Sequence, residues 1–186
     1  MVRLAVLVAS LALAVDLLAP AAPADTGGAK ARRFFSARQG VGIEAPSGWS
    51  MSLHTGYSNV LCVFIHPGGS RISLAVDRTA AKDAATLAAN SRPGLVAQGL
   101  TVDRTSSGPR EGVVVDARST RRDQAVRQLY LVRPVEGSRS ERQAIVLTLT
   151  TSLSDLPAAS GPFEWVVGHL TLESPAHPED KSDGGG

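Results

Sequence analysis

Apolar and polar residues alternate along much of the chain with the period of two that is typical of β-strands. The clearest case is Arg71–Asp77, in which isoleucine, leucine and valine at every second position share one side and mostly polar residues face the other. Comparable runs predict strands at Phe34–Phe35, Val41–Glu44, around Trp49 and Met51, and at Asn59–His66, Leu100–Thr105, Val113–Arg118, Gln124–Arg133 and Gln143–Thr151. The short connections Pro67–Gly69, Thr120–Asp123 and Pro134–Glu141 leave room only for antiparallel hairpins.

Two segments change to the helical period of 3.6 residues. The first is rich in alanine and runs from Thr79 to Gln98, where Pro93 predicts a kink or two helical pieces and Gly99 predicts the end. In the second helix, we expect Ser160 to be the cap and Pro162 to lie in the first turn. Its single apolar stripe consists of Phe163, Val166, Val167 and Leu170.

The order of elements is strands, a helix, strands and a second helix, with hairpins inside each group of strands. The predicted fold class is therefore α+β, an antiparallel β-sheet with helices packed on it. Several strands are apolar on both faces, which predicts helices on both sides and a three-layer α/β/α sandwich. The segment 34–173 has the length of a single domain with one sizeable core.

The N-terminus carries the three zones of a cleavable signal peptide. Arg3 supplies a positive charge, Leu4–Val15 is apolar apart from one serine, and Ala22–Ala24 is an A-x-A cleavage pattern. We therefore expect a signal peptide at 1–24 and a mature protein that is secreted or periplasmic. Asp16, near the end of the apolar run, leaves open the alternative of an uncut segment that holds the domain at the membrane.

Two segments of low complexity flank the predicted domain. The stretch 25–33 is predicted to be a flexible lead-in, and the stretch 174–186 is predicted to be a disordered tail, because it is polar and rich in proline and glycine. No cysteine lies near the cleavage point, so we do not expect a lipoprotein. A membrane span needs about 20 apolar residues, and none is expected after cleavage.

Charge and cysteine content narrow the possible partners. The formal net charge is only +2, and the arginines are spread among acidic residues, whereas nucleic-acid binding usually needs a clustered basic face. The single cysteine, Cys62, excludes an intramolecular disulfide. It lies in the apolar run Val60–Ile65, where apolar surroundings raise a thiol pKa, so we expect a buried and inert thiol.

Local patterns in the predicted domain resemble the superfamily of PsbP, DcrB and the Ran-binding Mog proteins. The segment Gly42–Trp49 is similar to its opening strand with a proline and a Gly-Trp pair. The segments Arg127–Val132 and Ala144–Thr150 are similar to its paired C-terminal strands, and Phe163–Leu172 is similar to its closing helix. The resemblance implies the three-layer fold. Members serve as photosystem subunits, periplasmic lipoproteins, GTPase binders and secretion chaperones, so it also implies binding in place of catalysis.

Histidine and tryptophan residues offer little chemistry in this sequence. The histidines are His54, His66, His169 and His177, and none belongs to a metal-binding motif. His66 ends a predicted strand beside a turn, where pairing with Asp77 across the hairpin is the alternative to an exposed turn residue. Trp49 follows a Pro-Ser-Gly turn, and we expect it to fill the core.

Serine and carboxylate residues also lack the partners that catalysis needs. Ser70 follows two glycines, but a hairpin turn explains this better than a nucleophile does. Glu111 and Asp116 are candidates for paired carboxylates, and the nearby Arg110 and Arg118 suggest surface ion pairs. The sequence therefore predicts no catalytic residue, no cofactor-binding residue, no cofactor and no metal site.

The predicted function is that of a non-enzymatic extracytoplasmic binding or accessory protein, with another protein of the cell envelope as its partner. Its contact surface is expected at the outer edge of the sheet or around the first helix. One alternative is an assembly or secretion chaperone with an apolar groove beside Phe34, Phe35 and Tyr57. Another is an unrecognised hydrolase, which needs a deep pocket with converging polar side chains.

Overall fold

The computed structural model describes residues 33–53, 55–135, 138 and 140–174. The predicted signal peptide, the lead-in up to residue 32 and the tail from residue 175 lie outside the described residues. His54 and His177 lie outside them as well.

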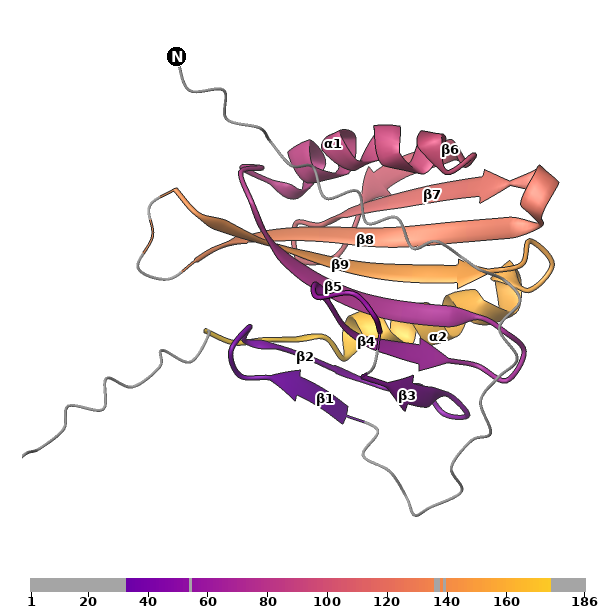
Figure 1. Ribbon diagram of the computed structural model, residues 1–186, viewed down its shortest axis with the longest axis horizontal. Helices are drawn as coiled ribbons and strands as arrows, with labels where there is room; N and C mark the ends of the chain where they lie inside the picture. Colours follow the sequence, from indigo (N-terminus) through magenta and orange to yellow (C-terminus); the bar gives the residue numbers. More distant parts are fainter. Residues whose placement is uncertain (1–32, 54, 136–137, 139, 175–186) are drawn as a thin grey trace, which may run out of the picture.

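A seven-stranded antiparallel sheet forms the middle of the molecule (Figure 1). Its strands, in spatial order, are β3 (Ser50–Ser52), β4 (Val60–Ile65), β5 (Arg71–Thr79), β9 (Arg142–Thr151), β8 (Gln124–Pro134), β7 (Val113–Ser119) and β6 (Thr101–Ser107). A short 3₁₀ turn, η1 (Thr120–Arg122), joins β7 to β8. The predicted antiparallel sheet is therefore confirmed.

A second, three-stranded sheet lies beside the main one. It consists of β1 (Arg33–Ser36), β2 (Val41–Glu44) and β10 (Thr171–Leu172), in the order β1-β2-β10. The two N-terminal strands were predicted, but their separation from the main sheet was not. Strand β10 follows the last helix and pairs antiparallel with β2, so the small sheet joins the two ends of the described chain.

Each helix covers a different face of the main sheet, as the three-layer prediction requires (Figure 1). Helix α2 (Leu156–Gly168) packs with the small sheet over one face and encloses the larger core. This core includes Phe64, Leu74, Leu129, Ile145, Leu147, Phe163 and Val166. Helix α1 (Ala84–Ala97) packs over the other face, here called the α1 face, against Ala117, Val126 and Tyr130. Successive residues of β8 and β9 alternate between the two cores, which explains why these strands are apolar on both sides.

Helix α1 is one continuous helix, so of the two alternatives predicted at Pro93, a kink or two helical pieces, the second is wrong. It begins after Asp83, whose carboxylate accepts a hydrogen bond from the Thr86 N–H at 2.7 Å. Pro93 lies inside the helix, and Leu95 beyond it is buried against the sheet. Tertiary contacts on both sides of the proline thus hold the helix together despite the missing donor.

Helix α2 begins one turn earlier than the sequence predicted. Asp155 is its N-cap residue and Pro157 takes the first-turn position that was assigned to Pro162. The predicted cap, Ser160, lies inside the helix, where its hydroxyl donates to the Leu156 carbonyl at 2.7 Å. Pro162 also lies inside. Burial of the residues next to it, on the apolar face, outweighs the proline's local preference.

The connection between β6 and β7 is a tight turn with unusual backbone angles. The Gly112 N–H donates to the Pro109 carbonyl at 3.0 Å, and the two central residues, Arg110 and Glu111, have φ values of 57° and 59°. These are the angles of a type I′ turn, which favours asparagine and glycine. Arg110 reaches from this turn to the Leu170 carbonyl at 2.6 Å and so contacts the chain after α2.

Candidate functional site

Trp49 and His66 pack against each other instead of forming a site. Trp49 is buried in the larger core, as predicted, and its ring centroid lies 5.3 Å from that of His66. His66 Nδ1 accepts a hydrogen bond from the Gly68 N–H at 3.1 Å. The pairing of His66 with Asp77 does not form, because the β4–β5 register places His66 at the turn and Asp77 at the opposite end of β5.

Ser70 is buried, and its hydroxyl lies 2.8 Å from the Thr151 hydroxyl. Its main-chain oxygen accepts from the His66 N–H, which is the hairpin role predicted for it. His169 stacks on Trp165 with ring centroids 3.7 Å apart, and therefore flanks the apolar stripe of α2 as expected.

Arg118 forms a surface ion pair, as suggested, but its partner is not the neighbouring Asp116. Asp116 pairs with Arg127 at 2.7 Å, its direct partner across β7 and β8. Arg118 pairs with Asp103 on β6 at 3.1 Å. Asp116 and Arg127 are direct cross-strand neighbours, which lie only about 5 Å apart and so closer than residues two positions apart on one strand. Pairing across the sheet therefore wins over pairing along the chain.

Cys62 behaves as the sequence predicted. Its side chain is fully buried in the larger core. Desolvation raises the pKa of the thiol to about 12, so the thiolate that would act as a nucleophile is suppressed at neutral pH.

The feature that sequence reasoning did not locate is a cavity of about 410 Å³ between α1 and the sheet. Its walls come from β5, β8, β9 and α1. Small residues on both sides create it. The sheet contributes Ala75 and Ala144, and α1 contributes Ser91 and Gly94 beside Leu87 and Leu95. Side chains this short leave the space between α1 and the sheet unfilled, so a hollow remains.

Tyr130 and Gln128, on the floor of this cavity, belong to a row of hydrogen-bonding side chains that continues across the sheet. The Tyr130 hydroxyl donates to Gln128 Oε1, and Gln128 Nε2 donates to the Thr148 hydroxyl at 3.1 Å. Thr148 is in turn the register partner of Ser73 on β5. All four side chains are more than nine-tenths buried. Among the described residues, the Ser73 hydroxyl is the one buried side-chain polar atom without a hydrogen-bond partner.

Tyr130 stays protonated at neutral pH in this setting. Burial raises the pKa of its phenol to about 12, and a hydrogen bond with Ser91 on α1 opposes this effect only in part. The floor of the cavity therefore consists of neutral groups that can donate and accept hydrogen bonds.

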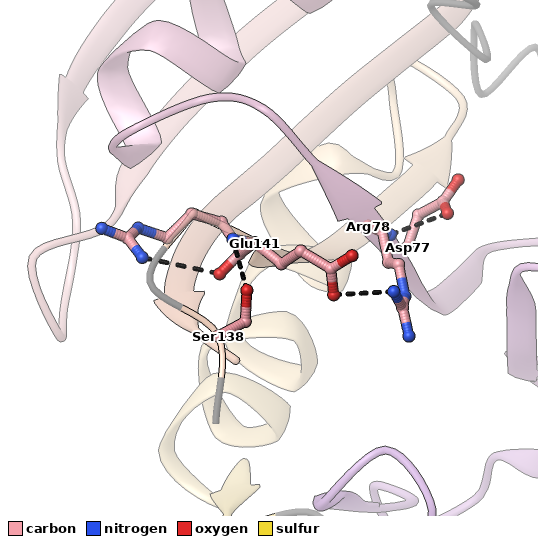
Figure 2. A network of polar contacts seen from close by, with 5 residues as sticks. Asp77, Arg78, Ser138 and Glu141 are labelled. Atoms are coloured by element: carbon pink, nitrogen blue, oxygen red, sulfur yellow. Dashed lines mark hydrogen bonds and ion pairs between the residues drawn. The ribbon is translucent and has the colours of Figure 1, made fainter. Parts of the chain in front are cut away.

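Charged groups occur at the mouth of the cavity, where β5 ends. Asp77 and Arg78 line it there, and Arg78 Nη1 forms an ion pair with Glu141 Oε2 at 2.7 Å. Figure 2 shows the side chains of Arg78 and Glu141 pointing toward each other, with Ser138 accepting from the Glu141 N–H at 3.0 Å. The Arg78 side chain is 76% exposed, so this cation is solvated and already paired.

A second hollow of about 370 Å³ lies on the opposite flank of α1, over β6 and β7. It is lined by Ala85, Ala89, Val102 and Val113, among others. The floor row that includes Tyr130 and Gln128 does not reach it. This second hollow provides an internal comparison for the first.

Two of the three residues proposed for a chaperone groove are exposed. Phe35 is 41% exposed and Tyr57 is 45% exposed, whereas Phe34 packs against the larger core. Two of the three residues predicted for the chaperone groove are therefore available for contact with a partner.

Helices of the described ranges are all too short or too polar to cross a membrane.

Comparison with known proteins shows the fold. No family model and no curated protein matches the sequence. The solution structure of cyanobacterial PsbP (CyanoP) from Synechocystis sp. PCC 6803 is similar, with a TM-score of 0.55 and 13% identity over 80% of this chain and 96% of that one. LpqN, involved in cell envelope biogenesis of Mycobacterium tuberculosis, is also similar, with a TM-score of 0.53 and 13% identity over 71% of this chain and 82% of that one. The chain therefore has the PsbP-like fold that the sequence patterns implied.

Proposed function

We propose that this protein is a non-enzymatic binding or accessory protein of the extracytoplasmic space, and that the cavity beside α1 is its binding element. The observation that carries the proposal is the chemistry of the cavity. Its floor offers neutral hydrogen-bonding groups from Gln128 and Tyr130, while the ionised groups of its lining, Asp77 and Arg78, stand at the mouth.

This arrangement favours binding over acid–base catalysis. A general acid or base works best with a pKa near the operating pH. Burial moves the pKa of Tyr130 to about 12, which is away from that range. Arg78 is held by Glu141, and the thiol of Cys62 lies in the other core. The cavity can therefore hold a molecule more readily than it can transform one.

The fold comparisons support an accessory role outside the cytoplasm. CyanoP is a PsbP protein, and LpqN is a protein involved in cell envelope biogenesis. The signal-peptide pattern at 1–24 points to the same compartment, and the single domain is proposed to span 34–173. A partner in the cell envelope, itself a protein, would then receive or present the bound molecule.

Mass spectrometry of the protein purified from its native envelope or culture medium tests the binding element. We expect a compound that copurifies with the wild type and is lost from Val146→Phe, because Val146 lines the cavity. Val113→Phe, in the second hollow, is the matched control and should keep the compound. Retention by Val146→Phe, or hydrolytic turnover of the compound by the wild type, contradicts the proposal.

N-terminal sequencing of the exported material tests the compartment. A mature protein that begins near Asp25 supports cleavage and export, whereas material that begins at Met1 contradicts it.

The second candidate function is that of a chaperone for an apolar segment of a partner protein. The exposure of Phe35 and Tyr57 is the observation that favours it. Light scattering of heat-denatured citrate synthase gives a direct assay. If the chaperone function holds, the wild type suppresses aggregation and the double variant Phe35→Ser, Tyr57→Ser does so less. Equal scattering with both proteins rejects it.

A further inference from the structure

We propose that the cavity beside α1 takes an uncharged molecule that combines an apolar body with at least one hydrogen-bonding group. This inference rests on the proposed function, because it assumes that the cavity is the binding element. It adds the chemical class of the ligand, which follows from three properties of the walls.

The first property is that the described residues on the floor of the cavity include no ionised group. A buried ion without a partner is strongly unfavourable, and Gln128 and Tyr130 present no counter-charge. The cation at the mouth, Arg78, is paired with Glu141 at 2.7 Å, and the carboxylate offsets its attraction for an anion. The remaining mouth charge, Asp77, repels anions. A neutral ligand avoids each of these penalties.

The second property is unused hydrogen-bonding capacity on the floor. Besides its donation to Gln128 and its hydrogen bond with Ser91, the Tyr130 oxygen retains a lone pair that can accept. Gln128 Nε2 has two N–H groups, and its hydrogen bond to Thr148 uses one of them. Ser73 lies two positions from the cavity-lining Ala75 on the same face, and its buried hydroxyl has no partner among the described residues. The floor can therefore form hydrogen bonds with a polar group of a bound molecule.

The third property is the apolar character of the upper walls. Leu87 and Leu95 reach down from α1, and Val146 and Ala144 rise from β9. The volume of about 410 Å³ lies in the range of roughly 300–1,000 Å³ found for small-molecule sites. Such a space accepts an apolar body whose polar group faces Tyr130.

Two fluorescent probes separate this ligand class from its alternatives. N-phenyl-1-naphthylamine is neutral and carries one N–H donor, and 8-anilino-1-naphthalenesulfonate has the same ring system with an added anionic sulfonate. Titration of the full-length exported protein with each probe compares the two. We expect the neutral probe to bind at least tenfold more tightly than the anionic one.

Cavity variants place the bound probe. Val146→Phe fills the cavity from the side of the sheet and should weaken binding of the neutral probe at least tenfold, whereas Val113→Phe should leave it within twofold. Ser91→Leu fills the cavity from the helix side and replaces Val146→Phe if circular dichroism shows that the latter does not fold. Tyr130→Phe removes the acceptor on the floor and should weaken binding about threefold to tenfold, the effect of one hydrogen bond.

The outcomes separate the two proposals. If both probes bind equally well and Val146→Phe abolishes both, the cavity binds but the ligand class is wrong. If Val146→Phe and Val113→Phe have equal effects, or the neutral probe does not bind saturably, the cavity is not the binding element and both proposals fail. The expected pattern, with a preference for the neutral probe that Val146→Phe removes, supports both.

Discussion

The guanidinium of Arg133, near the end of β8, donates from Nη2 to the Gly40 carbonyl at 3.2 Å and thereby ties the small sheet to the main one. The same nitrogen also donates to the Gln39 carbonyl, and Nη1 donates to the Glu173 carbonyl at 2.7 Å. Arg133 Nε donates to Gln143 Oε1 on β9, and Gln143 Nε2 in turn donates to Gln39 Oε1. One side chain therefore joins both ends of the described chain to the central strands.

Replacement of Arg133 by lysine should destabilise the protein although it keeps the charge. A lysine has a single nitrogen and cannot reach acceptors on three sides, so we expect a loss of about 2 kcal/mol in the free energy of unfolding. Urea denaturation measures it. Arg78→Lys is the control, since its exposed ion pair should contribute less than about 0.5 kcal/mol. Equal losses in the two variants would contradict the bridging role of Arg133.

Gly112→Ala should lower stability because the added methyl has no room. A Cβ at this position would lie 2.6 Å from Leu131 Cδ2 and 2.9 Å from the Pro109 carbonyl. Overpacking of this kind costs about 1–3 kcal/mol. Gly161→Ala, in the middle of α2 with nothing within 4 Å, should instead stabilise by up to about 1 kcal/mol. Thermal unfolding of both variants checks the opposite signs.

Glu111→Gly should stabilise the protein, against the usual effect of a glycine. The φ of 59° at this position is in the left-handed region, which is unfavourable for residues with a side chain by about 1–2 kcal/mol. Part of this gain is lost to the greater freedom of the unfolded chain, so we expect about 0.5–1 kcal/mol. Chemical denaturation measures the change, with the exposed helical Ala158→Gly as a control that should lose about 1 kcal/mol. A loss of stability in both variants would contradict the claim that the backbone at Glu111 is strained.

Asp83 should make the stability of α1 depend on pH. Its carboxylate accepts from the Thr86 N–H, and this hydrogen bond lowers the pKa of the carboxyl below 3.8. A lowered pKa in the folded state stabilises the protein above the unfolded value, and the contribution disappears as pH falls through the folded value. The difference in free energy of unfolding between wild type and Asp83→Ala should therefore shrink in strong acid.

Asp83→Asn is the matched control for this effect, because asparagine also caps helices but does not titrate. Its difference from Asp83→Ala should stay constant with pH. Urea denaturation between neutral pH and about pH 2.5 measures both differences, and a wild-type advantage that grows on acidification would contradict the assignment.

Cys62 should resist alkylation while the protein is folded. Its side chain is fully buried and burial raises the pKa of the thiol to about 12, so both access and the reactive thiolate are suppressed. Mass spectrometry should show no adduct after iodoacetamide treatment in buffer and one adduct in concentrated urea. Comparable rates in both conditions would show that the thiol is accessible in the native state.

Sequence patterns predicted the strands well because each strand carries its own alternation. The register of β8 and β9 follows from it, since Leu129, Leu147 and Ile145 share the larger core while Tyr130 and Val146 face α1. The helix boundaries were harder to predict from the sequence. Pro162 is a strong local signal for a helix start, but burial of the neighbouring Phe163 and Val166 on α2 overrides it.

The cavity could not be predicted from the same patterns, because it depends on side chains of separate segments that do not reach one another. Ala75 and Ala144 come from β5 and β9, and Ser91 and Gly94 come from α1, a third segment. Each is an ordinary residue in its own element. Gln128 was the nearest signal, as a polar residue at a buried position of β8. Only the packing of the three segments shows that their small side chains face a common space.

The central pair of strands also determines when the chain can fold. Strand β5 pairs along its whole length with β9, so that Arg71 lies opposite Thr150 and Thr79 lies opposite Arg142. Contacts between residues so distant in sequence form slowly, because a long loop must close first. A ribosome or an export channel that releases the chain from its N-terminus would deliver β5 long before its partner. Until β9 emerges, the apolar edge of β5 is unpaired, and a holding factor in that interval would protect it from aggregation.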